Sequence, residues 1–425
     1  MERYEAYKDS GVEWIGEIPV GWKTHRLKHM ASNRVIPAES EAGRYLGLEQ
    51  VQSWTMTIVY EAEDEADTAG ILYDEACVMF GKLRPYLAKV ALPNSSGPCS
   101  SEFLVLQPLS IKRSYLAYTL VNKLFISEVN AMTYGVRMPR VGWDLVGNLQ
   151  LPVPPEREQE RIADYLDDKT AEIDAIVADC EREVELLKEY RKAVISEAVT
   201  KGLDPDVPMK DSGVKWIGEI PTGWQCTKLG LISVSTLGRM LDTEKQTGDC
   251  LAPYLSNRDV QWFHIDDSDL KEMDFPYEMR GSYEIRDGDM LVCEGGEVGR
   301  SAVWHGPTPS FYFQKAIHRV RFDTSVMNPA FAAYQMFQKA QVTMFREVRK
   351  GESTIGHLPG DQLRQLTLIV PPLDEQHDIV TRLDAKTAEI DSLIEAKQSM
   401  VDKLREYRRS LISEAVTGKF KVPGV

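Results

Sequence analysis

The sequence predicts an α+β protein in which two globular mixed α/β domains are separated by two long antiparallel helices that form a coiled coil. Three features lead to this prediction: an internal repeat, a long heptad-patterned segment at the end of each repeat copy, and short strand-like segments between. The chain has 425 residues, 43% of them hydrophobic and 27% charged. This length usually corresponds to two or three domains, and this composition can form sizeable cores.

The repeat has two conserved blocks. The lead-in KDSGVEWIGEIPVGW at 8–22 returns at 210–224 with 13 of 15 positions identical. A second block, 151–200, aligns without a gap with 368–417, and 26 of 50 positions are identical. The segments between the blocks share little sequence. A duplicated frame with divergent inserts suggests that the frame assembles something while each insert recognises something different.

The blocks define the domain boundaries. We assign an N-terminal domain to 1–150, a first helical segment to 151–203, a C-terminal domain to 204–367 and a second helical segment to 368–425.

Each helical segment has start and stop signals. Pro154-Pro155 and Pro371-Pro372 stand where a helix would begin, acidic residues follow, and Gly202 and Gly418 end the pattern. Apolar residues recur every seven positions, and the first row is Leu166, Ile173, Cys180, Leu187 and Val194, then Leu383, Ile390, Leu404 and Leu411. We expect helices of about 43 residues, or about 65 Å.

A second apolar row lies three residues after the first, and it includes Ile176, Tyr190, Leu393, Met400 and Tyr407. The two rows predict a coiled-coil seam, in which polar Lys169, Glu183 and Lys386 would fix the register. The alternative is two amphipathic helices that each cover their own domain. Helices this long exceed what a domain of about 130 residues can cover, which favours pairing.

The inserts alternate short apolar runs with turns. In the first we expect strands at 45–51, 77–80, 87–92 and 103–106 and a helix over 115–130. In the second we expect a turn at Asp287-Gly288 leading into a strand, strands at 302–304 and 318–322, and a helix over 328–348.

The sequence contains no convincing catalytic motif. Walker A, GxSxG and HExxH strings are absent, Gly295-Gly296 lacks dinucleotide-binding spacing, and Asn328-Pro329 is better explained as a helix start than as a methyltransferase motif. The six cysteines form no CxxC pair, so we expect neither a zinc site nor a disulfide scaffold. The missing motifs predict that this chain itself holds no metal ion and no cofactor. The N-terminus lacks a signal peptide and no apolar run reaches membrane length, which predicts a cytoplasmic protein with no membrane association.

The net charge of −15 argues at first against a nucleic-acid partner, because phosphate contacts need Lys and Arg. The charge is unevenly distributed, however. Residues 151–205 carry −7, whereas 80–140 and 300–350 each carry +6. Each insert therefore keeps a locally basic segment that can contact DNA.

The candidate DNA-binding residues are cations, aromatics and polar side chains of these segments, because such groups hold phosphates and read base edges. They are Lys82, Arg84, Tyr86, Arg113, Tyr134, Arg137 and Arg140 in the first insert, and Arg300, Gln314, Lys315, His318, Arg319, Arg346, Lys350, Ser353 and Thr354 in the second. Any one of them could instead be a solvated surface residue.

The order of these elements resembles the specificity (S) subunit of type I restriction–modification enzymes. The resemblance covers nearly the whole chain and is carried by the WIGEIPxGW lead-in, the ISEAVT helix end and the Pro-Pro…Glu-Gln helix start, which is Pro154, Pro155, Glu158 and Gln159 in one copy and Pro371, Pro372, Glu375 and Gln376 in the other.

The resemblance implies a non-catalytic DNA-binding subunit for bacterial defence and DNA methylation. The inserts would be target recognition domains that each read one half of an asymmetric double-stranded DNA target. Two methyltransferase (modification) subunits carrying S-adenosylmethionine would methylate adenine at N6. Restriction/translocase subunits using ATP and Mg would join for cleavage. A competing hypothesis is a coiled-coil adaptor whose two domains bind proteins, and a further one is a self-contained enzyme.

Overall fold

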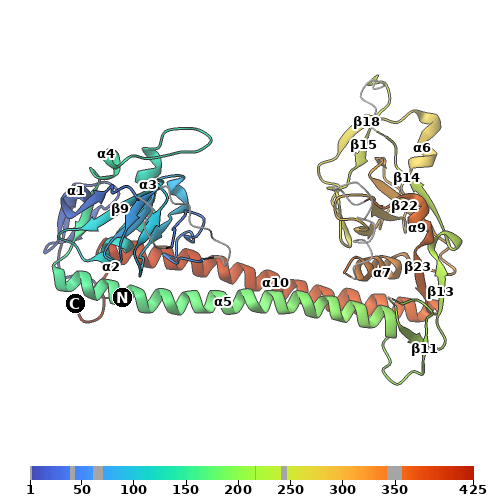
Figure 1. The fold of residues 1–425 in the computed structure, drawn as a ribbon. Coiled ribbons are helices and arrows are strands. Elements are labelled where there is room, and N and C mark those ends of the chain that lie inside the picture. Colours follow the sequence, from blue (N-terminus) through green and yellow to red (C-terminus); the bar gives the residue numbers. More distant parts are fainter. Residues whose placement is uncertain (1, 39–43, 61–69, 216, 241–246, 342–356) are drawn as a thin grey trace. The chain divides into compact units, whose positions relative to one another are not determined.

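The computed structural model describes residues 2–38, 44–60, 70–215, 217–240, 247–341 and 357–425. The chain forms two compact units. Unit 1 comprises Met1–Arg182 and Lys397–Val425, and unit 2 comprises Glu183–Ala396. Two long helices, α5 (Glu156–Lys201) and α10 (Leu373–Val416), each contribute one end to each unit (Figure 1).

Unit 1 is built around a four-stranded antiparallel sheet of order β4-β9-β6-β7 with two helices beside it. Its strands are β1 (Tyr7–Asp9), β2 (Glu17–Pro19), β3 (Lys23–Arg26), β4 (Ala31–Arg34), β5 (Ile71–Tyr73), β6 (Val78–Gly81), β7 (Val90–Ala91), β8 (Gly97–Cys99), β9 (Phe103–Pro108) and β10 (Gln150–Val153). Its helices are α1 (Leu27–Met30), η1 (Pro85–Leu87), α2 (Arg113–Val121), α3 (Lys123–Ala131), α4 (Trp143–Val146) and the first part of α5.

Unit 2 repeats this plan with a four-stranded sheet of order β14-β22-β19-β20 and adds a three-stranded sheet of order β18-β15-β21. Its strands are β11 (Met209–Asp211), β12 (Glu219–Pro221), β13 (Gln225–Lys228), β14 (Ser233–Leu237), β15 (Leu251–Leu255), β16 (Val260–Gln261), β17 (His264–Ile265), β18 (Lys271–Asp274), β19 (Met290–Cys293), β20 (Ser301–Val303), β21 (Tyr312–Phe313), β22 (Ile317–Phe322) and β23 (Thr367–Val370). Its shorter helices are η2 (Leu229–Leu231), α6 (Tyr277–Tyr283), α7 (Pro329–Gln341) and α9 (Gly360–Gln365).

Most predicted elements are confirmed, with three local corrections. The strand expected at 87–92 is reduced to β7, because Leu87 ends η1 and Ala88 adopts a φ of +46°. The expected strand at 45–51 is wrong: Leu46 and Val51 make only isolated bridges, because the Gln50 side chain accepts a hydrogen bond from the Gly47 N–H (2.7 Å) and closes a turn. The helix expected over 115–130 is broken at Asn122, whose side chain instead caps α3 by accepting from the Leu124 N–H (2.8 Å). Of the helix expected over 328–348, the last part lies outside the described residues.

The Pro-Pro…Glu-Gln motif attaches each insert to its long helix. In unit 2, Gln376 is fully buried, accepts from the Asn328 N–H (2.7 Å), and donates to the carbonyls of Pro371 (2.8 Å) and Val326 (2.9 Å). In unit 1, Gln159 accepts from the Lys112 N–H and donates to the Pro154 carbonyl, both at 2.9 Å. The glutamine therefore joins the start of a long helix to the start of the insert's helix.

The two long helices pair antiparallel within each unit, as predicted. In unit 1, Cys180 lies 3.8 Å from Met400 (sulfur to sulfur), and Arg408 forms an ion pair with Asp174. In unit 2, Arg191 forms an ion pair with Asp391. The coiled-coil interpretation is confirmed in this local sense, and α5 and α10 have 46 and 44 residues, close to the expected 43.

The predicted second row of the seam is wrong. Ile176, Tyr190, Leu393, Met400 and Tyr407 are 41–51% exposed. The buried row lies four residues after the first row, not three, and it contains Thr170, Val177, Val184, Ala198, Thr387, Val401, Arg408 and Ala415. The polar residues proposed to fix the register also lie outside it, because Lys169 and Glu183 are exposed and Lys386 is only half-buried.

Threonines enter the seam because each insert supplies a hydrogen-bonding partner. The hydroxyl of Tyr118 on α2 donates to Asp167 (2.6 Å) and lies 3.2 Å from the Thr170 hydroxyl. In unit 2, the hydroxyl of Tyr334 on α7 donates to Asp384 (2.6 Å) and lies 3.4 Å from the Thr387 hydroxyl. Each domain is thus bonded to the helix on which it rests.

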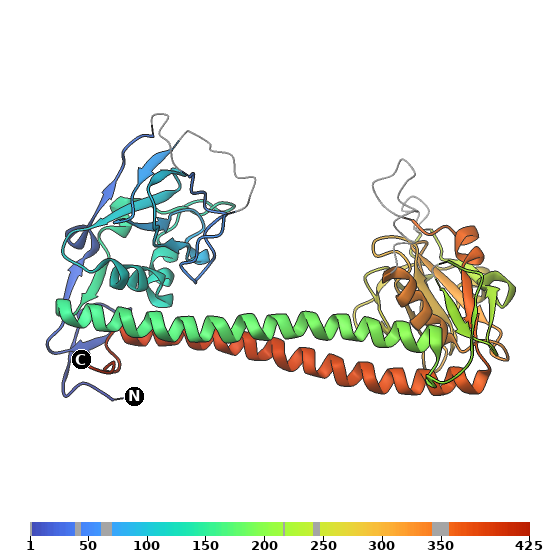
Figure 2. The ribbon, with the colours of Figure 1, turned by 60° about the horizontal axis from the view of Figure 1, so that its bottom comes forward.

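The second tryptophan of each lead-in, Trp22 or Trp224, packs against the end of a long helix. Gly418 adopts φ +69°, and a Cβ on it would lie 2.5 Å from Pro19 and 3.1 Å from Trp22. Gly202 adopts φ +80°, and a Cβ there would lie 3.1 Å from Trp224. The predicted helix stops are therefore confirmed. In unit 1 the two ends of the chain also lie together, because Glu2 and Lys421 form an antiparallel β-bridge (Figure 2).

Candidate nucleic-acid interface

The most exposed candidate surface in unit 1 is a short hairpin, 134–140. Tyr134 and Arg140 exchange two backbone hydrogen bonds of 3.0 Å, and Gly135 supplies a φ of +89° at the turn. Tyr134 is 62% exposed and Val136 is fully exposed. Arg137 lies at the tip and is also exposed. The hairpin presents an aromatic, an aliphatic and a cationic side chain on a hydrogen-bonded scaffold.

The second part of this surface is the turn at 82–88, which is joined to the hairpin by backbone hydrogen bonds. The Arg84 N–H donates to the Pro139 carbonyl (2.7 Å), and the Val141 N–H donates to the Lys82 carbonyl (3.1 Å). Arg84 has φ +50°, an uncommon conformation for a residue with a side chain. Tyr86 follows in η1 and is 46% exposed.

The fold therefore brings together six of the seven candidates predicted in the first insert, namely Lys82, Arg84, Tyr86, Tyr134, Arg137 and Arg140. Arg140 is braced within the domain, because its guanidinium donates to both oxygens of Glu102 (2.9 and 3.2 Å). The strong bidentate geometry of this pair holds the base of the hairpin.

Arg113 lies elsewhere and is bonded to the protein. Its Nε donates to the Cys77 carbonyl (3.0 Å) and its Nη2 to the Pro93 carbonyl (2.6 Å). Burial lowers the pKa of this guanidinium below its ordinary value. These contacts connect the start of α2 to two loops of the sheet.

Three candidates of the second insert also bond to the protein. Arg319 is 6% exposed and donates to the Glu284 carbonyl (2.5 Å), and burial lowers its pKa. His318 is buried with Nε2 2.9 Å from the Leu358 carbonyl oxygen, and burial lowers its pKa. Arg300 donates to the Asn257 carbonyl (2.5 Å). All three hold the sheet to neighbouring loops.

Gln314 and Lys315 lie at the edge of unit 2 beside β14. The Lys315 N–H donates to the Arg239 carbonyl (2.8 Å), and the side chain of Lys315 is exposed. Gly238 permits this close approach, because a Cβ there would lie 2.1 Å from the Gln314 carbonyl oxygen. Arg346, Lys350, Ser353 and Thr354 lie outside the described residues.

Two residues near this edge were not predicted. Tyr277 on α6 is 71% exposed, and the Arg280 guanidinium stacks 4.2 Å from its ring centre. Arg280 also lies 5.8 Å from the ring centre of Tyr312 on β21, the strand that precedes Gln314. A Tyr-x-x-Arg spacing places both side chains on one helix face and could have signalled this pair.

Among the residues that the structure describes, no group of histidine, cysteine or acidic side chains could hold a metal ion. In the same residues, no helix combines the length and the apolar character needed to cross a membrane.

The comparisons with known proteins agree with this architecture. The model of the type I restriction modification DNA specificity domain matches residues 78–186 and 221–401. The chain belongs to this family, and the resemblance seen in the sequence is confirmed. The two matched segments correspond to the two copies of the repeat.

Two curated relatives show the extent of the similarity. The EcoBI specificity subunit of Escherichia coli is 26% identical over 280 residues, covering 63% of this chain and 58% of that protein. The MjaVIII specificity subunit of Methanocaldococcus jannaschii is 23% identical over 322 residues, covering 72% and 70%. The chain therefore spans less than two thirds of the E. coli protein's length.

Solved structures confirm the predicted fold class. A chain from a type I R-M system, solved to study its complex assembly and conformational transition, aligns with TM-score 0.74 at 18% identity and covers 94% of this chain and 98% of its own length. The HsdS subunit of Thermoanaerobacter tengcongensis aligns with TM-score 0.53 over the same shares.

Proposed function

We propose that this chain is the non-catalytic DNA specificity subunit of a type I restriction–modification complex. Each α/β domain reads one half of an asymmetric bipartite target. The observation that supports this most directly is that one repeated frame carries two chemically different exposed surfaces. Unit 1 presents the hairpin 134–140 on the turn 82–88, whereas unit 2 presents the exposed Lys315 and the stacked pair of Tyr277 and Arg280.

The exposed cations have separate roles from the buried ones. Arg84 and Arg137 are free of the carbonyl contacts that engage Arg113 and Arg319, and they lie on projecting loops. Such arginines bind phosphates or pair bidentately with guanine, while Tyr134 and Val136 supply contacts to bases or sugars. Four candidates outside the described residues also belong to this hypothesis, namely Arg346, Lys350, Ser353 and Thr354.

The long helices are the proposed docking surface for two methyltransferase subunits. Large apolar side chains on them remain 41–63% exposed, and these are Ile176, Met400 and Tyr407 in unit 1 and Leu186, Tyr190 and Leu393 in unit 2. Exposed apolar side chains at regular helical positions suit a helical partner. The partners would carry S-adenosylmethionine, and restriction subunits would bring ATP and Mg. Such a complex would act in the cytoplasm.

Exchange of one insert tests the function. The segment 225–367 is replaced by the equivalent segment of a relative, the chain is produced with its methyltransferase partner, and methylated adenines are mapped. Only one half of the target should change. A change in both halves, or in neither, would contradict modular reading. The reciprocal exchange of 23–150 should alter the other half.

Duplex binding distinguishes this function from a protein-binding adaptor. The chain with its methyltransferase partner should bind duplex DNA with an affinity that falls steeply as salt rises. Binding that is absent at low salt would support the adaptor instead. We also propose that the paired long helices set the length of the spacer, which is the unread DNA between the two half-sites. Insertion of one heptad into both α5 and α10 should therefore change the spacer length, and an unchanged spacer would contradict this role.

A further inference from the structure

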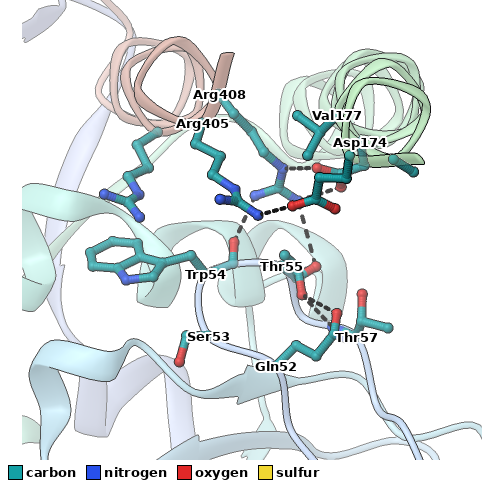
Figure 3. A pocket seen from close by; sticks show the side chains of 12 residues that line it. Gln52, Ser53, Trp54, Thr55, Thr57, Asp174, Val177, Arg405 and Arg408 are labelled. Atoms are coloured by element: carbon teal, nitrogen blue, oxygen red, sulfur yellow. Dashed lines mark hydrogen bonds and ion pairs between the residues drawn. The ribbon is translucent and has the colours of Figure 1, made fainter. Parts of the chain in front are cut away.

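A loop of unit 1, residues 52–57, rests on the pair of long helices. Trp54 and Met56 in this loop have φ values of +71° and +64°, which residues with side chains seldom adopt. The unusual backbone turns two successive carbonyls toward α10. The Trp54 carbonyl accepts from Nη1 of Arg408 (2.7 Å), and the Thr55 carbonyl lies 3.5 Å from Nη2 (Figure 3).

The same guanidinium also joins the two helices. Arg408 on α10 has a side chain only 5% exposed, and its Nε and Nη2 lie 2.8 and 3.1 Å from the carboxylate of Asp174 on α5. A single buried arginine therefore connects three segments: both helices and the loop. Arg409 adds a stacking contact, because its guanidinium lies 4.5 Å from the Trp54 ring centre.

The loop is attached by these polar contacts and also by apolar ones, because Trp54 and Met56 pack against the hydrophobic core of unit 1. The Trp54 N–H also donates to the Ala88 carbonyl (3.2 Å). A cavity of about 510 Å³ lies under it, lined mainly by polar and charged side chains such as Gln52, Thr57 and Glu181 (Figure 3). Loss of the Arg408 hydrogen bonds would leave the loop over this cavity. Arg408 thus supplies the hydrogen bonds from α10 to the loop backbone.

The loop also connects to the candidate DNA surface. Val51 at its base is fully buried in a cluster with Met79 of β6. β6 leads directly into the turn 82–88, which carries Arg84 and Tyr86. A shift of the loop would therefore move the strand from which the candidate reading side chains project.

Unit 2 contains an equivalent ion pair but a different loop attachment. Arg191 on α5 pairs with Asp391 on α10 (2.9 Å), and the loop residue Phe263 has φ +62°. The Phe263 ring lies 4.5 Å from the Tyr334 ring centre and 5.4 Å from that of Phe337. Aromatic contacts between the loop and α7 therefore remain even when the arginine is removed.

We propose that Arg408 is a positioning residue that sets the angle at which the N-terminal domain meets its half-site, by holding the carbonyls of Trp54 and Thr55 to the helix pair. This inference rests on the proposed function. It adds that spacer selectivity depends on this contact in the N-terminal domain, and depends far less on Arg191 in the C-terminal domain.

The test compares Arg408→Met with the matched control Arg191→Met. Each chain is produced with its methyltransferase partner and given a plasmid library containing the native target with its spacer unchanged or changed by one base pair. In wild type, methylation should strongly favour the native spacer. In Arg408→Met this preference should fall about tenfold or more, which corresponds to about 1.4 kcal/mol. In Arg191→Met it should fall less than about threefold.

A charge exchange separates loop positioning from simple helix pairing. The double variant Arg408→Asp with Asp174→Arg restores an ion pair between the helices, but aspartate cannot donate to the loop carbonyls. Thermal stability should recover while spacer selectivity stays lost. If selectivity recovers together with stability, the role of Arg408 is helix pairing and the proposal is overturned.

Two further outcomes are decisive. Unchanged selectivity in a folded Arg408→Met chain overturns the proposal, and if that variant does not fold, Arg408→Lys takes its place. Lysine keeps the charge toward Asp174 but offers a single donor group, so selectivity should be intermediate, and wild-type selectivity would refute the proposal. Failure of the wild-type complex to methylate any bipartite site would instead count against the proposed function.

Discussion

Replacement of Gln376 should be among the most damaging single changes in the frame. Its amide is fully buried and makes three hydrogen bonds, one from the Asn328 N–H and two to the carbonyls of Pro371 and Val326. Gln376→Leu would leave all three backbone groups without these partners. A buried unsatisfied group costs about 1–3 kcal/mol, and partial relaxation makes about 3–6 kcal/mol the expected loss.

The repeat provides an internal comparison. Gln159 makes two such bonds instead of three, so Gln159→Leu should cost less, about 2–4 kcal/mol. Gln398→Leu on the exposed face of α10 serves as the control and should stay within about 0.5 kcal/mol of wild type. The free energy of unfolding is measured by urea denaturation of the whole chain.

Gln376→Glu adds a dependence on pH. A carboxylate can accept from the Asn328 N–H but cannot donate to the two carbonyls, so the folded state favours the protonated acid and raises the pKa of the new glutamate. The folded chain then binds more protons than the unfolded chain above about pH 4.3, and stability is lost as pH rises through the raised pKa.

A Gln376→Leu variant whose free energy of unfolding falls by under about 1 kcal/mol, or by less than that of Gln159→Leu, would refute the reasoning about the buried glutamine.

Three other changes have defined outcomes. Gly238→Ala should destabilise the chain by about 2–3 kcal/mol in urea denaturation, because its Cβ would meet the Gln314 carbonyl oxygen at 2.1 Å, whereas Gly223→Ala meets nothing within 4 Å and should be neutral. Burial lowers the pKa of Lys339 to about 7, so the unfolding free energy of wild type should rise relative to Lys339→Met between about pH 7 and pH 10, and parallel pH curves would contradict this. Arg137→Ala should leave stability unchanged but reduce the salt slope of duplex binding by about 1, and an unchanged slope would remove this residue from the interface.

The duplicated frame could be predicted in detail because its signals are local. Proline pairs mark where α5 and α10 begin, and Gly202 and Gly418 mark where they end. The register of the seam could not be predicted from apolar spacing. Thr170 and Arg408 occupy buried positions because Tyr118 and the Trp54 carbonyl reach them from the insert. A one-dimensional pattern contains no information about such partners.

The candidate site was predictable only in part for a similar reason. The basic segments do place Arg84 and Arg137 on one exposed surface. Arg113 and Arg319 have the same residue type in equally basic segments, yet their guanidinium groups bond to backbone carbonyls inside the domain. Charge counting cannot separate exposed arginines from those bonded within the domain, because the carbonyls belong to loops far away in sequence.

The composition of unit 1 has a consequence for synthesis. Its hydrophobic core includes Trp22 and Leu27 near the start of the chain together with Leu411, Ala415 and Phe420 near its end. Unit 2, in contrast, is one continuous stretch, Glu183–Ala396. On the ribosome, the domain that is made first must wait for residues 397–425 before its core is complete, while the domain made second can close earlier. A frameshift after residue 396 would therefore damage the N-terminal domain and spare the C-terminal one.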